Sequence, residues 1–429
     1  MVMKKVEPAD LSAVEAVRLI AKGSLTSEAL VHSCLERIVQ REPEVQAFEH
    51  LAREAALAEA RAADSLPPRG PLHGLPFAAK DNYDTFDMPT TSGSPIYAGN
   101  RPSCDASAVA LARSAGAILV GKTVTTEFAY VKPAKTRNPH DRSRAPGGSS
   151  SGSAAAVAAG MVPLAFGSQT VGSVIRPAAY CGTAAFKPTF GLLPVTGIKG
   201  MAWSLDTVGV FGRAVADCAL LVDAILGTSY LDALETGGPP SIALCHTQDW
   251  PDAGAEAISA LEEAASVFSK VGAKVRAIKL PSDFARLRDA LMTILAFEMA
   301  KVLMPEVARH RELLSPQLDE QLERGRAISF DEYSKAKSAT AACRAKLEDL
   351  FGDTDILMAH AAPGEAPVGN AYTGFSFLNG VCTMLGTPCV NVPGLKGPNS
   401  MPIGLLTIGR VGDDKRTLAA ANWMALRLA

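Results

Sequence analysis

Hydrophobic positions follow helical spacing in some stretches and form short continuous runs in others, which predicts an α/β protein. The first stretch, residues 9–64, predicts three helices: 11–21 capped by Asp10, 27–40 capped by Thr26, and 45–63. Apolar runs at 75–81 and 117–121 predict buried strands, separated by a helix over 106–115.

The second half of the chain continues this alternation. It predicts strands and helices at 241–245 (strand), 255–270 (helix), 274–280 (strand), 283–350 (charged helices), 355–360, 389–392 and 403–408 (strands) and 415–428 (helix). We find no internal repeat and no shift of composition. The pattern predicts one large domain over 1–429, with a central mixed sheet between helices. Within it we expect N-terminal helices at 9–64, a catalytic core at about 70–230 and a variable helical layer at about 283–350.

Glycine and serine dominate residues 147–153 and recur at 167–173. A flexible linker would have such a composition, but here apolar sequence follows directly at 154–159 and 161–166. We therefore expect these residues to be packed inside the domain. Buried serine hydroxyls need partners, and closely spaced glycines let several backbone N–H groups point at one anion. This combination indicates acyl-transfer chemistry.

Composition narrows the range of partners. The chain has 429 residues, 48% hydrophobic and 20% charged, with a net charge of −2, as in an ordinary soluble protein. Since no basic stripe is present, we expect neither nucleic acid nor a membrane surface as partner, but a small-molecule substrate. No apolar run reaches the length of a membrane span, and the N-terminus lacks the pattern of a signal peptide. The eight scattered cysteines, without a CxxC pair, predict reduced and mostly buried thiols. The expected location is cytoplasmic.

Two motifs suggest other functions. Gly116, Gly121, Lys122 and Thr123 match the nucleotide-binding P-loop pattern. In a P-loop the residues between the two glycines form the loop itself, whereas here they are β-branched and apolar and follow a helix. The context therefore favours a strand over a nucleotide site.

The second motif is Gly148-Ser-Ser-Ser-Gly152, which fits the G-x-S-x-G nucleophile elbow around Ser150. An elbow needs a strand directly upstream, and residues 138–146 do not have a strand pattern. It also needs a later histidine. His246, His310 and His360 are available, but none has a recognisable triad setting.

The Gly/Ser run, its spacing to Ser173, and residues 177–189 together resemble the amidase signature family, in particular its malonamidase-type members. The resemblance extends over nearly the whole chain, from 74–81 through 115–123 to 402–404. It implies Lys80, Ser149 and Ser173 as a Ser-cisSer-Lys triad. Ser173 would be the nucleophile, Ser149, in a cis peptide, would relay its proton, and Lys80 would be the base. A lysine can act as a base only as a neutral amine, which burial favours.

The same resemblance implies an oxyanion hole formed by the backbone N–H groups of Thr170, Val171, Gly172 and Ser173. Many family members have glycine where Val171 stands, so the hole should persist while the acyl pocket is reshaped. Gln169 replaces a common aspartate and receives no role. Arg176 matches an arginine that contacts the substrate carboxylate in malonamidase-type members, and pinning the loop is the alternative role.

These observations predict an amidohydrolase that cleaves a small linear amide without a cofactor or a metal. Carbamate, aryl-amide or ester hydrolysis on the same triad stays open. An amidotransferase subunit ranks lower, because the late part of the chain shows no basic docking surface, and a P-loop protein ranks last. Whether the chain forms a homodimer also stays open.

Overall fold

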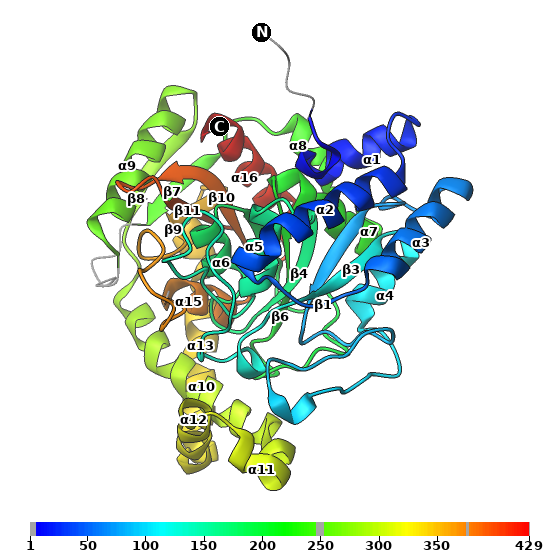
Figure 1. Ribbon diagram of the computed structural model, residues 1–429. Helices are drawn as coiled ribbons and strands as arrows, with labels where there is room; N and C mark the ends of the chain where they lie inside the picture. Colours follow the sequence, from blue (N-terminus) through cyan, green and yellow to red (C-terminus); the bar gives the residue numbers. More distant parts are fainter. Residues whose placement is uncertain (1–5, 246–252, 375–376, 429) are drawn as a thin grey trace.

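The computed structural model describes residues 6–245, 253–374 and 377–428 (Figure 1). The strands are β1 (Phe48–Leu51), β2 (Pro76–Lys80), β3 (Ile118–Thr123), β4 (Leu164–Gln169), β5 (Ala184–Lys187), β6 (Thr207–Gly212), β7 (Ser241–Cys245), β8 (Lys274–Ile278), β9 (Ile356–His360), β10 (Cys389–Lys396) and β11 (Pro402–Ile408).

The α-helices are α1 (Ala13–Ala21), α2 (Ser27–Val45), α3 (Arg53–Ser65), α4 (Ser107–Ser114), α5 (Ser151–Ala158), α6 (Ile175–Cys181), α7 (Val215–Leu226), α8 (Tyr230–Thr236), α9 (Ala255–Lys270), α10 (Leu287–Val302), α11 (Met304–His310), α12 (Pro316–Ala327), α13 (Phe330–Arg344), α14 (Leu347–Phe351), α15 (Phe377–Leu385) and α16 (Asp414–Leu428). Short 3₁₀ helices are η1 (Pro8–Asp10), η2 (Pro95–Tyr97), η3 (Glu127–Ala129), η4 (Ser282–Arg286) and η5 (Arg311–Leu313).

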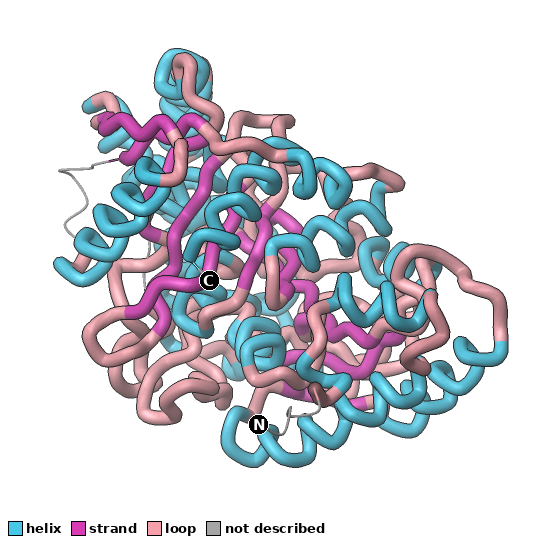
Figure 2. The backbone as a smooth tube through the Cα atoms, turned by 90° about the horizontal axis from the view of Figure 1, so that it is seen from above, coloured by secondary structure: helices cyan, strands magenta, loops and turns pink. Residues whose placement is uncertain are grey.

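One sheet carries all eleven strands of the described residues, in the order β1-β3-β2-β4-β6-β5-β10-β11-β9-β7-β8. β2 runs parallel to β3 and β4, and β7 runs parallel to β8 and β9, whereas the strands in the middle pair antiparallel. Figure 2 shows the sheet from above with helices on both faces. The predicted α/β fold with a central mixed sheet is confirmed.

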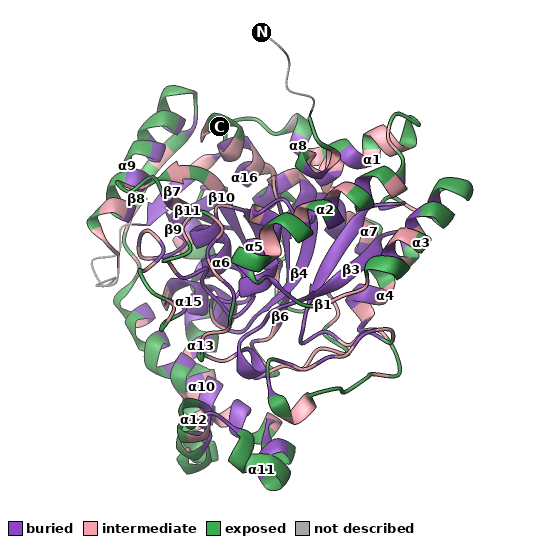
Figure 3. Cartoon of the chain, in the orientation of Figure 1, coloured by how far each residue is buried: buried purple, intermediate pink, exposed green. Residues whose placement is uncertain are grey.

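The sheet separates two apolar layers. Phe77 and Ala79 of β2 belong to one core cluster, together with residues of α1, α4, α7 and α16, while Ala78 between them belongs to another, with residues of α2, α3 and α5. This division follows from the alternation of side chains along a strand. In Figure 3 the central strands are buried, and the exposed surface lies on the outer turns of helices such as α3, α9 and α12. Both faces of the sheet are thus covered, which places the strand ends at the edges of the core.

The N-terminal region differs from the prediction in two places. The cap of α1 is Ser12, which forms a capping box with Glu15, and Asp10 instead pairs with Arg37. The predicted helix over 45–63 is wrong: the chain forms β1 and then α3, and α2 continues to Val45. The helix stops because Gln46 has a left-handed backbone conformation, and the Glu42 carboxylate accepts the next two backbone N–H groups.

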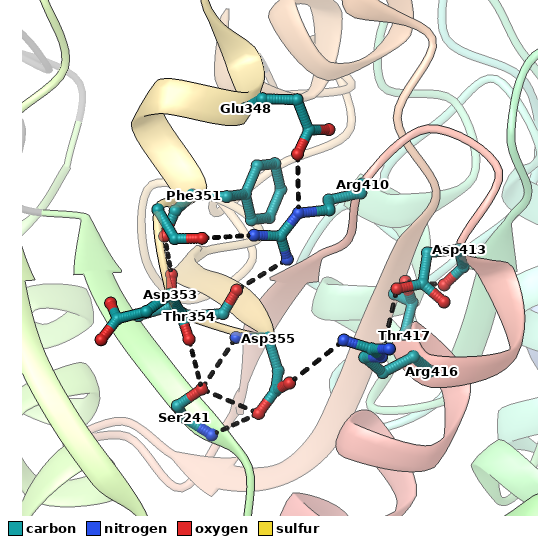
Figure 4. Close-up of polar contacts among 11 residues, drawn as sticks. Ser241, Glu348, Phe351, Asp353, Thr354, Asp355, Arg410, Asp413, Arg416 and Thr417 are labelled. Carbon is teal, nitrogen blue, oxygen red and sulfur yellow. Dashed lines mark hydrogen bonds and ion pairs between the residues drawn. The ribbon is translucent and has the colours of Figure 1, made fainter.

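A charged cluster closes the opposite end of the sheet (Figure 4). Arg410, just after β11, donates to the carbonyls of Gly352 and Thr354 behind α14 and pairs with Glu348. Asp355, just before β9, accepts from the backbone N–H and hydroxyl of Ser241 at the start of β7. These contacts fix the returning end of the helical layer to the strands.

The other predicted elements are confirmed with small changes of length, including the helical region at 283–350 and the parallel β7-α9-β8 unit. Helix α15, which follows the Gly/Pro-rich loop after β9, was not predicted. Seven of the eight free cysteines are buried, as expected; Cys104 is exposed. None of the helices within the described ranges is long and apolar enough to cross a membrane.

Candidate active site

Lys80 lies at the carboxyl end of β2, where the parallel strands β2, β3 and β4 end together. The apolar run before it is fully buried, so the strand carries the lysine into the interior instead of to the surface. Its Nζ lies 2.7 Å from Oγ of Ser149 and 3.0 Å from Oγ of Ser168 on β4. The topology thus brings together two of the three predicted triad residues.

Burial lowers the pKa of Lys80 to about 7. The negative charge of Asp206 acts in the opposite direction, and the positive charge of Arg176 lowers the pKa further. An amine with a pKa near neutrality is a neutral base for a large fraction of the time at physiological pH. The electrostatic setting therefore suits Lys80 to accept a proton.

The Gly/Ser run is buried from Gly147 through Val157, as predicted. The Gly148–Ser149 peptide bond is cis. Ser150 does not have the setting of an elbow nucleophile, because its Oγ exchanges hydrogen bonds with the backbone of Ser168, and no strand directly precedes it in the described structure. Its role is to hold the Gly/Ser run against β4.

The segment 170–173 connects β4 to α6. Among the described residues, the backbone N–H groups of Val171, Gly172 and Ser173 have no hydrogen-bond acceptor. Unpaired backbone donors at buried positions are rare in native proteins unless a ligand takes them. The Ser173 carbonyl accepts the N–H of Ser150 at 3.3 Å, so its backbone contacts the residue that follows Ser149. These donors are suited to hold an oxyanion.

Gln169 orders this segment, a role that the sequence did not reveal. Its Oε1 accepts the N–H groups of Val174 and Ile175, and its Nε2 donates to Oγ1 of Thr383 on α15. The hydroxyl of Thr383 also reaches the carbonyl of Val171. A glutamine can serve as both acceptor and donor, so one side chain ties the segment to α6 and to α15.

The side chain of Val171 packs toward α15 and belongs to the apolar contacts of that layer. A Cβ added to Gly380 of α15 would lie 3.0 Å from Cγ1 of Val171. The glycine therefore leaves the space that the valine occupies. The expectation that Val171 reshapes an acyl pocket stays a prediction.

Arg176 is buried in α6, and its Nη2 donates to the carbonyl of Gly148 at 2.5 Å. Its Nε has no partner in the described part of the chain. A Cβ added to Gly172 would lie 3.6 Å from Nη1, so the guanidinium reaches both the Gly/Ser run and the segment with the free donors. Contact with a substrate carboxylate stays a prediction.

Three polar residues around Lys80 were missed as site residues. Ser168 links Lys80 to Nδ2 of Asn82, and Asp206 accepts the hydroxyl of Thr170 at 2.6 Å and two backbone N–H groups. Burial raises the pKa of Asp206 to about 6. Ser168 beside Gly167 and Asn82 two residues after Lys80 were visible signals. Asp206 could not be found, because only the pairing of β4 with β6 brings it close.

The P-loop match is a strand end, as predicted. Lys122 is buried in β3 and bonds to Asp81, Oγ1 of Thr90 and a carbonyl. No helix follows Thr123 directly, so the motif lacks the shape of a phosphate loop. Of the histidines considered for an elbow triad, His246 lies outside the described residues. Burial lowers the pKa of His360 to about 4, which leaves it uncharged at neutral pH.

Similarity to known proteins agrees with this geometry. Residues 29–418 match the protein-family model described as Amidase. A subunit of the glutamyl-tRNA(Gln) amidotransferase of Chloroflexus aggregans is 33% identical over 458 aligned residues, which cover 94% of this chain and 93% of the relative. The similarity to an amidotransferase subunit gives more support to that alternative than the sequence alone suggested.

Solved structures share the fold over the full length. A crystal structure described as an amidase superposes with a TM-score of 0.89 at 31% identity, covering 98% of this chain and 100% of the other. An inhibitor-bound structure, described as a vestigial protein complex that reveals the evolutionary origins of an s-triazine catabolic enzyme, has a TM-score of 0.89 at 30% identity. It covers 96% of this chain and 97% of the other.

Proposed function

This chain belongs to the Amidase family, and from that premise we propose that it is an amidohydrolase that cleaves the C–N bond of a small amide through an acyl-serine intermediate. The observation that carries the proposal is the contact between Lys80 and Ser149. A buried amine with a pKa of about 7 lies 2.7 Å from a serine hydroxyl, which is the arrangement needed for a proton relay.

In the proposed reaction, the hydroxyl of Ser173 attacks the amide carbonyl carbon. Its proton passes to Ser149, while the proton of Ser149 passes to Lys80. The N–H groups of Val171, Gly172 and Ser173 stabilise the negative charge on the carbonyl oxygen. When the C–N bond breaks, Lys80 returns the proton through Ser149 to the leaving nitrogen. Water then attacks the acyl-serine by the same relay, which releases the acid and restores Ser173.

Labelling with a fluorophosphonate tests the nucleophile. Mass spectrometry should place the adduct on Ser173, and Ser173→Ala should abolish both the adduct and amide hydrolysis without loss of fold. Ser150→Ala serves as the matched control, because it changes a neighbouring buried serine and should leave the adduct in place. An adduct on Ser150 would restore the elbow interpretation and overturn the proposal.

The substrate of this reaction stays open between linear amides, aryl amides, carbamates and esters, because all react by acyl transfer. A hydrolysis screen over these four classes separates them. Cofactor-free action on a small molecule in the cytoplasm is part of the proposal.

A second candidate role is that of an amidotransferase component, supported by the similarity to the Chloroflexus aggregans protein over 93% of that relative's length. In that role the chain would release ammonia from an amide for use by a partner protein. Purification of the untagged complex from its native cell tests this candidate. Stoichiometric partners that stimulate amide hydrolysis would favour the second candidate, and full activity of the isolated chain would favour the first. The same measurement of native mass decides whether the chain forms a homodimer.

A further inference from the structure

A cavity of about 260 Å³ adjoins the polar partners of Lys80. Asn82 and Ser168 form part of its wall, and both side chains belong to the hydrogen-bonded group around the lysine. The cavity opens to solvent beside Trp203 and Val195, which are 52% and 45% exposed. A cavity of about 150 Å³ already suffices for a benzene molecule. The space next to Lys80 therefore has room for an aromatic ring with a substituent.

Most of the remaining wall is apolar. The apolar side chains are Ala129, Val195, Ile198, Met201, Trp203 and Val302. They come from η3, from the chain between β5 and β6 and from the end of α10, so distant segments meet to form it. Apolar walls with a few placed polar groups are the usual form of a small-molecule site.

The polar groups of the wall favour a ligand that donates a hydrogen bond. The Oδ1 atom of Asn82 is buried and has no partner within the described ranges, although buried polar atoms are normally paired. The carboxylate of Asp206 also lines the cavity and would repel a ligand carboxylate. Lys199 is the wall residue of opposite charge, but Glu306 already pairs with it. The balance of charge thus disfavours an anionic group.

We propose that this cavity receives an uncharged aryl or alkyl group of the substrate, with Oδ1 of Asn82 accepting a hydrogen bond from an N–H or O–H of that group. This inference rests on the proposed function and specifies the substrate class: an amide with one apolar substituent. The proximity of the cavity to Lys80, through Ser168, places such a substituent next to the reacting bond.

Three amides test the inference: acetamide, phenylacetamide and acetanilide. At least one of the two aryl amides should exceed acetamide in kcat/KM by about tenfold or more, because apolar contacts of this size change rates by about that factor. Val302→Trp, which fills the cavity from the end of α10, should lower kcat/KM for that aryl amide about tenfold and leave acetamide within about twofold. Val195→Trp, at the exposed rim, is a second filling variant that carries less risk of misfolding. Val411→Trp is the matched control, since Val411 is an exposed valine outside the cavity and should change neither rate.

Calorimetry on Ser173→Ala separates this inference from the proposed function. The better aryl amide should bind to this variant, and Val302→Trp in the same background should weaken binding about tenfold. If the wild-type chain hydrolyses acetamide but no aryl amide binds or reacts better, the inference is overturned while the function stands. Equal losses for acetamide and aryl amides in the filling variants also overturn it. If no amide reacts and no fluorophosphonate adduct forms, the function fails, and calorimetry still decides whether the cavity binds the aryl group.

Discussion

Lys80 and Ser149 are in hydrogen-bond contact at 2.7 Å, although 69 residues separate them in the chain. Neither side chain would have this geometry from local structure alone. Lys80 is held by the end of β2, and Ser149 by the Gly/Ser run that Ser150 fixes to β4. The pairing of β2 with β4 therefore creates the contact.

The first prediction concerns the pH dependence of catalysis. Lys80 must be neutral to accept a proton, and its pKa is about 7, so it is protonated and inactive below this pH and active above it. We expect kcat/KM to rise with pH through one ionisation near 7 and then to level off. Lys80→Ala should lower kcat/KM by about 10²–10⁴-fold, the usual contribution of a general base.

Lys80→Arg is the control for charge and size, and it should also be inactive because a guanidinium does not lose its proton. A still-active Lys80→Ala variant with an unchanged ionisation would show that another group is the base.

The second prediction concerns Asp206, whose negative charge favours the protonated form of Lys80. Asp206 has a pKa of about 6, raised by burial and, to a lesser degree, by the charge of Glu298. It is therefore largely ionised when Lys80 loses its proton. Asp206→Asn removes this charge and should lower the pKa of Lys80, so the rise in kcat/KM should move to lower pH.

Thr170→Val is the matched control for Asp206, because it removes the hydrogen bond between the two side chains and keeps the charge. This variant should lower the rate without moving the ionisation. If Asp206→Asn shows the same ionisation as the parent, Asp206 has only a structural role. Circular dichroism of each variant checks that the fold is intact.

The strand-end position of Lys80, the burial of the Gly/Ser run and the strand nature of the P-loop match could all be predicted from the sequence, because they depend on local patterns of apolar residues. The residues that surround Lys80 could not. Asp206 and Ser168 come close through the antiparallel register of β4 and β6, in which Ser168 opposes Val208, and no local pattern specifies that register.

The error at the third predicted helix has a comparable cause. Ala- and Glu-rich sequence favours a helix over residues 45–63, but Phe48 and Leu51 pair with the edge of β3. Tertiary pairing with an otherwise exposed strand edge thus outweighed helix propensity over four residues. The role of Gln169 was missed for another reason: its partners lie on α6 and on α15, and α15 had no predicted element.

The third prediction concerns Gln169. Gln169→Leu keeps the size of the side chain but leaves the buried N–H groups of Val174 and Ile175 without their acceptor. An unsatisfied buried donor costs about 1–3 kcal/mol, so we expect a loss of about 2–4 kcal/mol in the free energy of unfolding, measured by urea denaturation. The rate should fall as well, since segment 170–173 carries the free donors.

Thr383→Val is the control for Gln169, because it removes the acceptor of Nε2 and leaves Oε1 bonded to α6. A loss of about 1 kcal/mol is expected for it. If the two variants lose equal stability, the contact with α15 and not the bonds to α6 orders the segment.

The last prediction concerns Arg176, which has two separable roles. Its Nη2 holds the carbonyl of Gly148, next to Ser149, and this bond does not depend on the substrate. Arg176→Met leaves that carbonyl without its donor, which costs about 1–3 kcal/mol. If this cost falls on the active geometry, kcat/KM for a neutral amide such as acetamide should fall about 5- to 150-fold.

The second role is contact with a substrate carboxylate, for which the side of the guanidinium toward Gly172 is placed. A charge-assisted bond to a carboxylate contributes more than one to a neutral group, so malonamate should lose at least about tenfold more than acetamide in Arg176→Met. Arg176→Lys keeps the charge but not the fork, and it should recover part of the malonamate loss and little of the loss for acetamide. Equal losses for the two substrates in both variants would show that Arg176 only holds the Gly/Ser run, because a residue that binds substrate charge must distinguish a charged substrate from a neutral one.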